Sequence, residues 1–292
     1  MDPVRRARRG LALFLGLVVP LSAIFEVQLL RAGTGIGSQP ALVIGLMWMP
    51  ALASVATRLL LREGFADVSF RLGQRRRWGY LTAWLFPLGV GALAYAVAWA
   101  TGLADFAPPQ RKLEAGHAVP VAFALRVGVQ LTVGMAISCL SAAGEEIGWR
   151  GYMLTRLIDA KVPRPVLVSG LIWCAWHVPL IAGGAYASNG SAALSVALFA
   201  TDILAFSYLI ARVRLETGSV WPAVLLHASW NAIIQGLFDT WTRGTSLWVG
   251  ESGILVSVVD VLLILWLVRG GWTMRRRPGD PEPVQLEGIA TL

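Results

Sequence analysis

Eight apolar segments, separated by short polar connections, follow one another along most of the chain. Each is close to the roughly 20 residues that a helix needs to cross about 30 Å of hydrocarbon. Charged residues make up 14% of the chain, whereas soluble domains carry about 25%. The pattern predicts an all-α, polytopic membrane protein with about eight transmembrane helices, at residues 11–30, 41–61, 81–103, 120–143, 165–182, 192–211, 220–237 and 253–268.

The basic residues follow the positive-inside rule. If the N-terminus is cytosolic and the segments alternate, 20 of the 25 lysines and arginines fall on the cytosolic side, four fall on the other side, and Arg126 lies within a segment. The net charge of +8 therefore indicates topology rather than nucleic-acid binding. We expect one transmembrane domain over residues 1–277 in the cell membrane, both termini in the cytosol, and a disordered cytosolic tail over residues 278–292.

Two adjacent acids and an arginine occur just after the fourth apolar segment, in the sequence GEEIGWR at residues 144–150. On a helix, Glu146 and Arg150 are four residues apart and share a face, so they can form an ion pair. Glu145 is rotated by about 100° from Glu146 and points elsewhere. We therefore expect one acid to be held by the arginine and the other to be free for chemistry.

Two of the three histidines, His177 and His227, lie within apolar segments, where polar side chains are costly. Trp173 and His177 are four residues apart, as are His227 and Asn231, so each pair shares a helix face. A single histidine in a membrane helix is usually a packing residue with a hydrogen-bond partner. Judged from the residues alone, this set favours an active site and a packing role about equally.

The polar residues form three motifs in order: an EExxxR motif, an aromatic-xxx-His motif that ends at His177, and an HxxxN motif that begins at His227. The set resembles the motifs of the CPBP family of intramembrane proteases, which includes the CAAX proteases and the bacteriocin-processing, or Abi, proteins. The resemblance covers a motif-bearing core of about residues 120–235. Phenylalanine is common in the family at the position of Trp173. The family resemblance implies a core bundle of the CAAX-protease type, with a site inside the bilayer that opens to the cytosol.

The resemblance also implies an activity: an intramembrane endopeptidase that hydrolyses a peptide bond in a membrane-associated or hydrophobic peptide. By the family pattern, Glu145 would be the general base that activates water, and His177 would be its partner on the water. His227 and Asn231 would stabilise the oxyanion. The site residues carried over in this way are Glu145, Glu146, His177, His227 and Asn231, with Arg150 and Trp173 in support.

A metal mechanism stays open at this point, because Glu145, His177 and His227 would also make an acceptable set of zinc ligands with an open fourth position. Glutamate-activated water is favoured, since no HExxH helix is present and Asn231 is a poor zinc ligand. No cofactor is therefore favoured. A non-catalytic bacteriocin-immunity or scaffold protein of the same fold, and a transporter, are the competing functions. The sequence does not identify the substrate.

The expected depths of two site residues conflict. Glu145 lies beyond residue 143, at the predicted cytosolic end of its segment, whereas His177 lies 12 residues after Pro165, or about 18 Å along a helix. The depths agree only if the fifth helix begins outside the bilayer or tilts strongly, and Pro179 could bend it.

Overall fold

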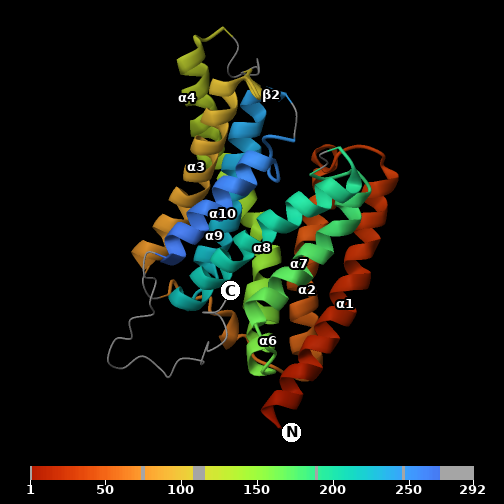
Figure 1. Cartoon of the computed structure of the whole chain (residues 1–292). Helices are drawn as coiled ribbons and strands as arrows, with labels where there is room; N and C mark the ends of the chain where they lie inside the picture. The colour runs from red at the N-terminus through yellow and green to blue at the C-terminus, as the bar shows by residue number, and fades with distance from the viewer. Residues whose placement is uncertain (1, 74–75, 108–115, 188–189, 245–246, 270–292) are drawn as a thin grey trace.

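The computed structural model describes residues 2–73, 76–107, 116–187, 190–244 and 247–269, and within these the chain forms eight helical rods packed as one bundle (Figure 1). Six rods are long and apolar enough to cross a membrane, by length and composition. The prediction of an all-α polytopic membrane protein is therefore confirmed. The rods are α1 (Pro3–Arg31), α2 (Pro40–Leu61), α3 (Arg76–Thr101), a fourth composite rod, α7 (Pro165–Ala182), α8 (Ala192–Thr217), α9 (Trp221–Trp230) continued by η5 (Asn231–Phe238), and α10 (Ile254–Arg269).

Prolines mark the beginnings of five helices. Proline is favoured there because its fixed φ suits the first turn and its missing N–H is one that the first turn leaves unpaired in any case. At α1, the side chain of Asp2 adds a cap by accepting a hydrogen bond from the backbone N–H of Arg5 (3.3 Å). The prolines at these first turns are Pro3, Pro40, Pro120, Pro165 and Pro222.

Several short elements complete the fold. The sequence did not predict the two-stranded antiparallel ribbon, in which Ala104 pairs with Gly244. Three single turns of 3₁₀ helix lie in connections or at a helix end. These elements are β1 (Ala104–Phe106), β2 (Thr242–Gly244), η1 (Ile36–Ser38), η2 (Ala66–Val68) and η6 (Asp239–Trp241).

The fourth rod is much longer than the predicted segment at 120–143. It is a continuous helical run of 41 residues, Val119–Asp159. The predicted boundary was wrong because it was placed where charged residues begin, whereas in the structure those charges are paired inside the bundle and the helix continues through them. The rod consists of α4 (Val119–Val129), η3 (Gln130–Gly134), α5 (Met135–Gly148), η4 (Trp149–Met153) and α6 (Leu154–Asp159), of which η3 and η4 are π-helical.

This long rod resolves the conflict in depth. Glu145 lies 14 residues before the end of α6 at Asp159, or about 21 Å, and His177 lies 12 residues after the start of α7 at Pro165, or about 18 Å. The two helices are joined by a short connection and pack against each other. The two side chains are therefore at similar heights without an unusual tilt of α7.

Two glycines bring α5 against α2. A Cβ atom at Gly144 would lie 2.5 Å from the carbonyl oxygen of Met47, and one at Gly148 would lie 2.4 Å from the Cβ of Pro50. Small residues four apart on a membrane helix allow this close approach of two backbones. The two glycines flank the acids Glu145 and Glu146 and so fix the helix turn that carries them.

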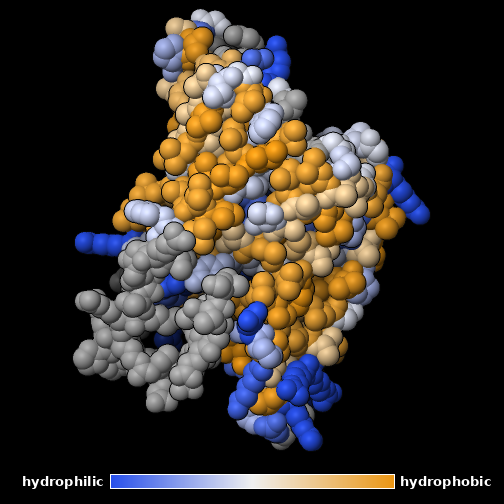
Figure 2. Space-filling model, in the orientation of Figure 1, coloured by the Kyte–Doolittle hydropathy of each residue, from blue (hydrophilic) through white to orange (hydrophobic). Residues whose placement is uncertain are grey.

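Hydrophilic side chains gather where α1 begins and α6 ends, and an apolar surface covers the middle of the bundle (Figure 2). At this end, the carboxylate of Asp67 accepts a hydrogen bond from Arg58 (2.5 Å) and forms an ion pair with Arg156 (2.9 Å). Arg156 also pairs with Glu63 (2.8 Å). Burial acts to raise the pKa of Asp67, but the hydrogen bond and the positive charges of the two arginines outweigh it and lower that pKa. We call this end of the bundle, which holds Arg58 and Arg156, the arginine-rich end.

The arginine-rich end is the end that the basic residues predict to be cytosolic. Arg31, predicted on the other side, lies at the opposite end of α1. The side of the membrane that each end faces stays a prediction. The predicted tail at 278–292 lies outside the described residues.

Candidate active site

Glu146 is fully buried and paired on two sides. Its Oε1 accepts a hydrogen bond from Nη1 of Arg150 (2.9 Å), as the four-residue spacing predicts, and also lies 2.9 Å from Nδ1 of His227. Arg150 donates through Nη2 to the hydroxyl of Ser207 on α8 (3.2 Å), and its guanidinium carbon lies 4.0 Å from the centre of the Trp173 ring. The acid therefore joins α5 to α9 directly and to α8 through the arginine.

Glu145 is in a different environment. Its side chain is buried, and its Oε2 accepts a hydrogen bond from the indole Nε1–H of Trp173 (2.7 Å). An indole N–H is a neutral donor, so it orients the carboxylate without adding a positive charge. The two adjacent acids thus differ. Glu146 is paired with the arginine, as expected, whereas Glu145, which was expected to be free, accepts a hydrogen bond from an indole.

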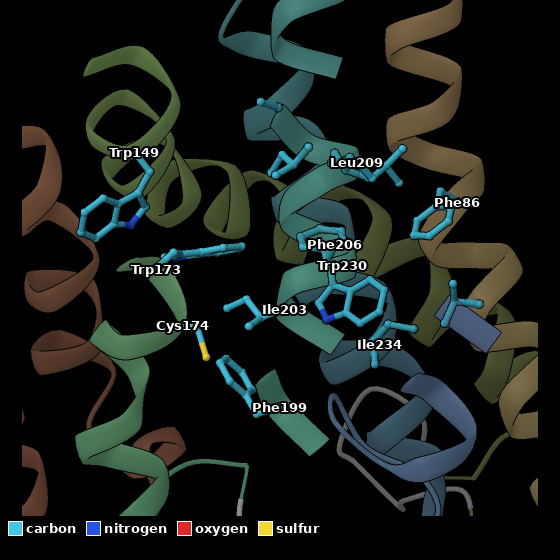
Figure 3. Packing of buried hydrophobic residues seen from close by; sticks show 14 of the residues in the cluster. Phe86, Trp149, Trp173, Cys174, Phe199, Ile203, Phe206, Leu209, Trp230 and Ile234 are labelled. Carbon is cyan, nitrogen blue, oxygen red and sulfur yellow. The ribbon is translucent and has the colours of Figure 1, made fainter. Parts of the chain in front are cut away.

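Trp173 is the central side chain of the site. Its ring makes edge-on contacts with both imidazoles, at 5.6 Å to His177 and 5.5 Å to His227 between ring centres. The same indole bonds Glu145, so one side chain contacts the acid and both histidines. Figure 3 shows its ring on α7, among the apolar side chains that α8 contributes. The sequence analysis placed Trp173 in support of the site but missed its N–H bond to Glu145, which the presence of tryptophan instead of phenylalanine could have suggested.

His177 is fixed by its own helix. Its Nδ1 lies 2.8 Å from the backbone oxygen of Trp173. A carbonyl oxygen only accepts, so Nδ1 carries the hydrogen, and Nε2 of the neutral ring is left as an acceptor. The ring also packs against Trp176 (4.8 Å) and Phe199 (4.9 Å).

His227 and Asn231 lie one helical turn apart on the seventh rod, as the HxxxN spacing predicts. The carboxylate of Glu146 orients the His227 ring through Nδ1. Asn231 is the first residue of η5, where the helix changes from α to π geometry. Such π segments within α-helices occur frequently at functional sites.

A cavity of about 100 Å³ joins these side chains. A water molecule occupies about 30 Å³ in the liquid, so the cavity is large enough for water beside a reacting group. The sequence analysis did not include four of the polar residues of its wall in the site. The predicted site residues that line it are Glu145, Trp173, His177, His227 and Asn231, and the additional polar ones are Tyr186, Asp202, Gln235 and Glu251.

The cavity extends toward the end of the bundle that lies opposite the arginine-rich end. Its walls include Leu29 near the end of α1, Val43 near the start of α2 and Tyr186 just after α7. All three positions are far from the arginine-rich end. The family resemblance implied a site that opens to the cytosol, so this direction agrees with that expectation only if the arginine-rich end is not the cytosolic one.

The metal alternative has no preassembled ligand set. Across the part of the chain that the structure describes, no group of three or more His, Cys, Asp and Glu side chains is arranged to hold a metal ion. Two of the three candidate ligands are engaged elsewhere, Glu145 with Trp173 and His227 with Glu146. Zinc dependence stays a question for experiment.

Residues 127–233 match a family model described as Rce1-like, type II CAAX prenyl endopeptidase. The matched segment contains all three motifs, so the family resemblance predicted from them is confirmed. This is a protease family, and the match supports an enzyme. Together with the apolar helices, it supports residence in a membrane. A search of curated proteins found no match to the chain.

Proposed function

We propose that this protein is an intramembrane endopeptidase that hydrolyses a peptide bond in a membrane-associated or hydrophobic peptide, with water activated by Glu145. One observation carries the proposal: Glu145, a buried carboxylate bonded by a neutral indole, lines the same cavity as the imidazoles of His177 and His227 and the amide of Asn231. Amide hydrolysis needs a base within reach of water and donors aimed at the developing oxyanion.

Glu145 and His177 together suit the activation of water. Both present acceptors, a carboxylate oxygen and the Nε2 of a ring whose Nδ1 carries the hydrogen. A water molecule can donate one hydrogen to each and direct a lone pair at the peptide carbonyl. The carbon–oxygen bond then forms while Glu145 takes the proton from the water.

His227 and Asn231 suit the stabilisation of the oxyanion. The side-chain amide of Asn231 is a donor. His227 can donate through Nε2 only when both ring nitrogens carry hydrogen, because the Glu146 carboxylate already requires a hydrogen on Nδ1. Glu146 favours that charged ring by lying against it. When the carbon–nitrogen bond breaks, Glu145 returns its proton to the departing amine, so the proton balance closes.

Substitution of Glu145 tests the proposal. The change Glu145→Gln keeps the shape of the side chain but removes the base, and we expect loss of product by roughly 100-fold or more. Glu26→Gln is the matched control, since Glu26 is a buried acid of a spanning helix that does not line the cavity. Membrane peptides from cells that express each variant would be compared by mass spectrometry, with size-exclusion chromatography as the check of folding.

The same measurement separates the enzyme from its main competitor. We expect His177→Ala and His227→Ala to remove the product peptides that Glu145→Gln removes. If all three folded variants keep the full biological effect of the wild type, the protein is a scaffold or immunity protein of this fold. Elemental analysis of the purified protein and treatment with a chelator test zinc, and we expect no stoichiometric metal and no loss of activity.

A further inference from the structure

Two acids that the proposed mechanism does not use lie on the wall of the cavity. Asp202, from the middle of α8, is 3% exposed, and Glu251 comes from the connection before α10. Neither belongs to a motif of the sequence. They lie in the part of the wall that faces away from the arginine-rich end, as does Tyr186, whose hydroxyl donates a hydrogen bond to Glu251.

Asp202 lacks a partner for part of its carboxylate. Its Oδ1 is buried and makes no hydrogen bond with the described residues. On the neighbouring α10, which packs against α8, Asp260 is completely buried and both of its carboxylate oxygens are also without a partner. Asp260 itself does not line the cavity. Buried carboxylates are costly unless they are paired or hydrogen-bonded, so Asp202, which does line the cavity, lacks a compensating group for its Oδ1.

The wall has no fixed positive charge to fill that role. Among the described residues that line the cavity, none is a lysine or an arginine, and its basic groups are the two imidazoles. One of these, His227, is already bonded to Glu146. A group that brought positive charge into the cavity would therefore meet Asp202 without displacing a protein partner from its Oδ1, and would also meet Glu251, which already accepts from Tyr186.

We propose that Asp202 and Glu251 form a subsite for a positively charged group of the peptide substrate, the side chain of a lysine or arginine or a free N-terminal amine. This subsite rests on the proposed peptidase function and adds a substrate class to it. The cationic group pairs with Asp202, and its apolar stem lies along the aromatic wall formed by Phe199 and Phe206. A peptide with a neutral residue at this position leaves Asp202 unpaired and is discriminated against.

Binding of a small amine tests the subsite without any need for proteolysis. The probe is n-hexylammonium chloride, and the neutral probe n-hexanol is its control. Thermal unfolding of the purified full-length protein in detergent gives the apparent dissociation constant. We expect n-hexylammonium to stabilise the wild type and to bind at least about tenfold more weakly to Asp202→Asn. Glu26→Gln is the matched control, because Glu26 is a buried acid of another spanning helix that does not line the cavity.

The outcomes are distinct. Equal stabilisation by n-hexanol and n-hexylammonium, or binding that Asp202→Asn leaves unchanged, would overturn the subsite. A second arm compares the membrane peptides of Asp202→Asn cells with those of the wild type, and we expect products with lysine or arginine near the cut to be lost first. If Glu145→Gln leaves the peptides unchanged, the peptidase function fails, while the amine measurement still decides whether Asp202 binds a cation.

Discussion

Replacement of Gly148 by alanine should displace α5 from α2 and inactivate the enzyme. The added Cβ would lie 2.4 Å from the Cβ of Pro50 and 2.5 and 2.6 Å from its backbone carbon and oxygen. Ordinary contacts between such atoms are about 3.5–4.0 Å, so the helices must separate by about 1 Å. The atoms of Pro50 belong to a backbone and a ring and cannot rotate away.

The cost of this separation follows from two general magnitudes. Overpacking of this kind destabilises proteins by roughly 1–3 kcal/mol. Glu145 and Glu146 lie on the preceding turn of the same helix and move with it, and a misplacement of about 1 Å at an active site can reduce a rate by roughly 100-fold. We therefore expect a lower unfolding temperature together with a loss of product peptides far greater than the loss of folded protein.

Gly128→Ala is the control for this experiment. It makes the same change in the same helical rod, but a Cβ at Gly128 would meet nothing within 4 Å. Alanine is favoured over glycine in a helix by roughly 0.5–1 kcal/mol, so this variant should be at least as stable as the wild type and fully active. Thermal unfolding in detergent and the comparison of membrane peptides give both quantities. If Gly148→Ala matches Gly128→Ala in both, the close approach of α5 and α2 does not position the acids.

Two further predictions concern pH and topology. Burial raises the pKa of Glu251 from 4.5 to about 7, against the opposing hydrogen bond from Tyr186. The folded state therefore binds the proton of Glu251 more tightly than the unfolded state does. The stability that this proton contributes is complete below pH 4.5 and is lost as the pH rises through 7. That contribution is at most roughly 3 kcal/mol, and solvent screening reduces it because Glu251 is partly exposed. The change Glu251→Gln should therefore flatten the fall in unfolding temperature between about pH 5 and 8. For topology, Gly37 and Gly64 lie at opposite ends of the bundle, and a Cβ at either position would meet nothing within 4 Å. In a background without native cysteines, an impermeant thiol reagent should label Gly37→Cys but not Gly64→Cys in intact cells. The reverse result would place the arginine-rich end outside the cell.

Hydropathy alone identified the positions of the helices, because a spanning helix must be apolar for nearly its whole length. It failed where charge lies inside the protein. The fourth helix continues to Asp159 because Glu146 is neutralised by Arg150 rather than by water. Hydropathy also gave no sign of the strand pairing between Ala104 and Gly244, because each strand has only three paired residues, too few for a periodic pattern.

Helical spacing identified which site residues share a face but not how the faces meet. The pairing of Glu146 with Arg150 follows from their separation of four residues on one helix. The contact between Glu146 and His227 joins residues 81 positions apart and depends on how α5 and α9 pack. The same holds for Asp202 and Glu251, which a sequence pattern cannot assign to the cavity because they belong to no motif and reach it from different elements.

The connection after α2 determines the height of α9. Arg214, near the end of α8, donates to the backbone oxygen of Asp67 in this connection (2.7 Å). From α2, Arg58 donates to Asp67 and also to the backbone oxygen of Gly151 in the long rod (3.2 Å). The buried arginines therefore hold the connection between the fourth rod and the end of α8, at the point where the chain turns into α9.

This arrangement sets the acid and an imidazole at the same level. A Cβ at Gly151 would lie 3.1 Å from Val68, and the next residue, Ser69, accepts the backbone N–H of Val220 (3.2 Å) just before α9 begins. Glu145 lies six residues before Gly151, about 9 Å from this level, and His227 lies seven residues after Val220, about 10.5 Å from it along its helix. The arginines that indicate the topology of the chain thus also align the residues of the site, and a change in their pairing should alter activity before it alters insertion into the membrane.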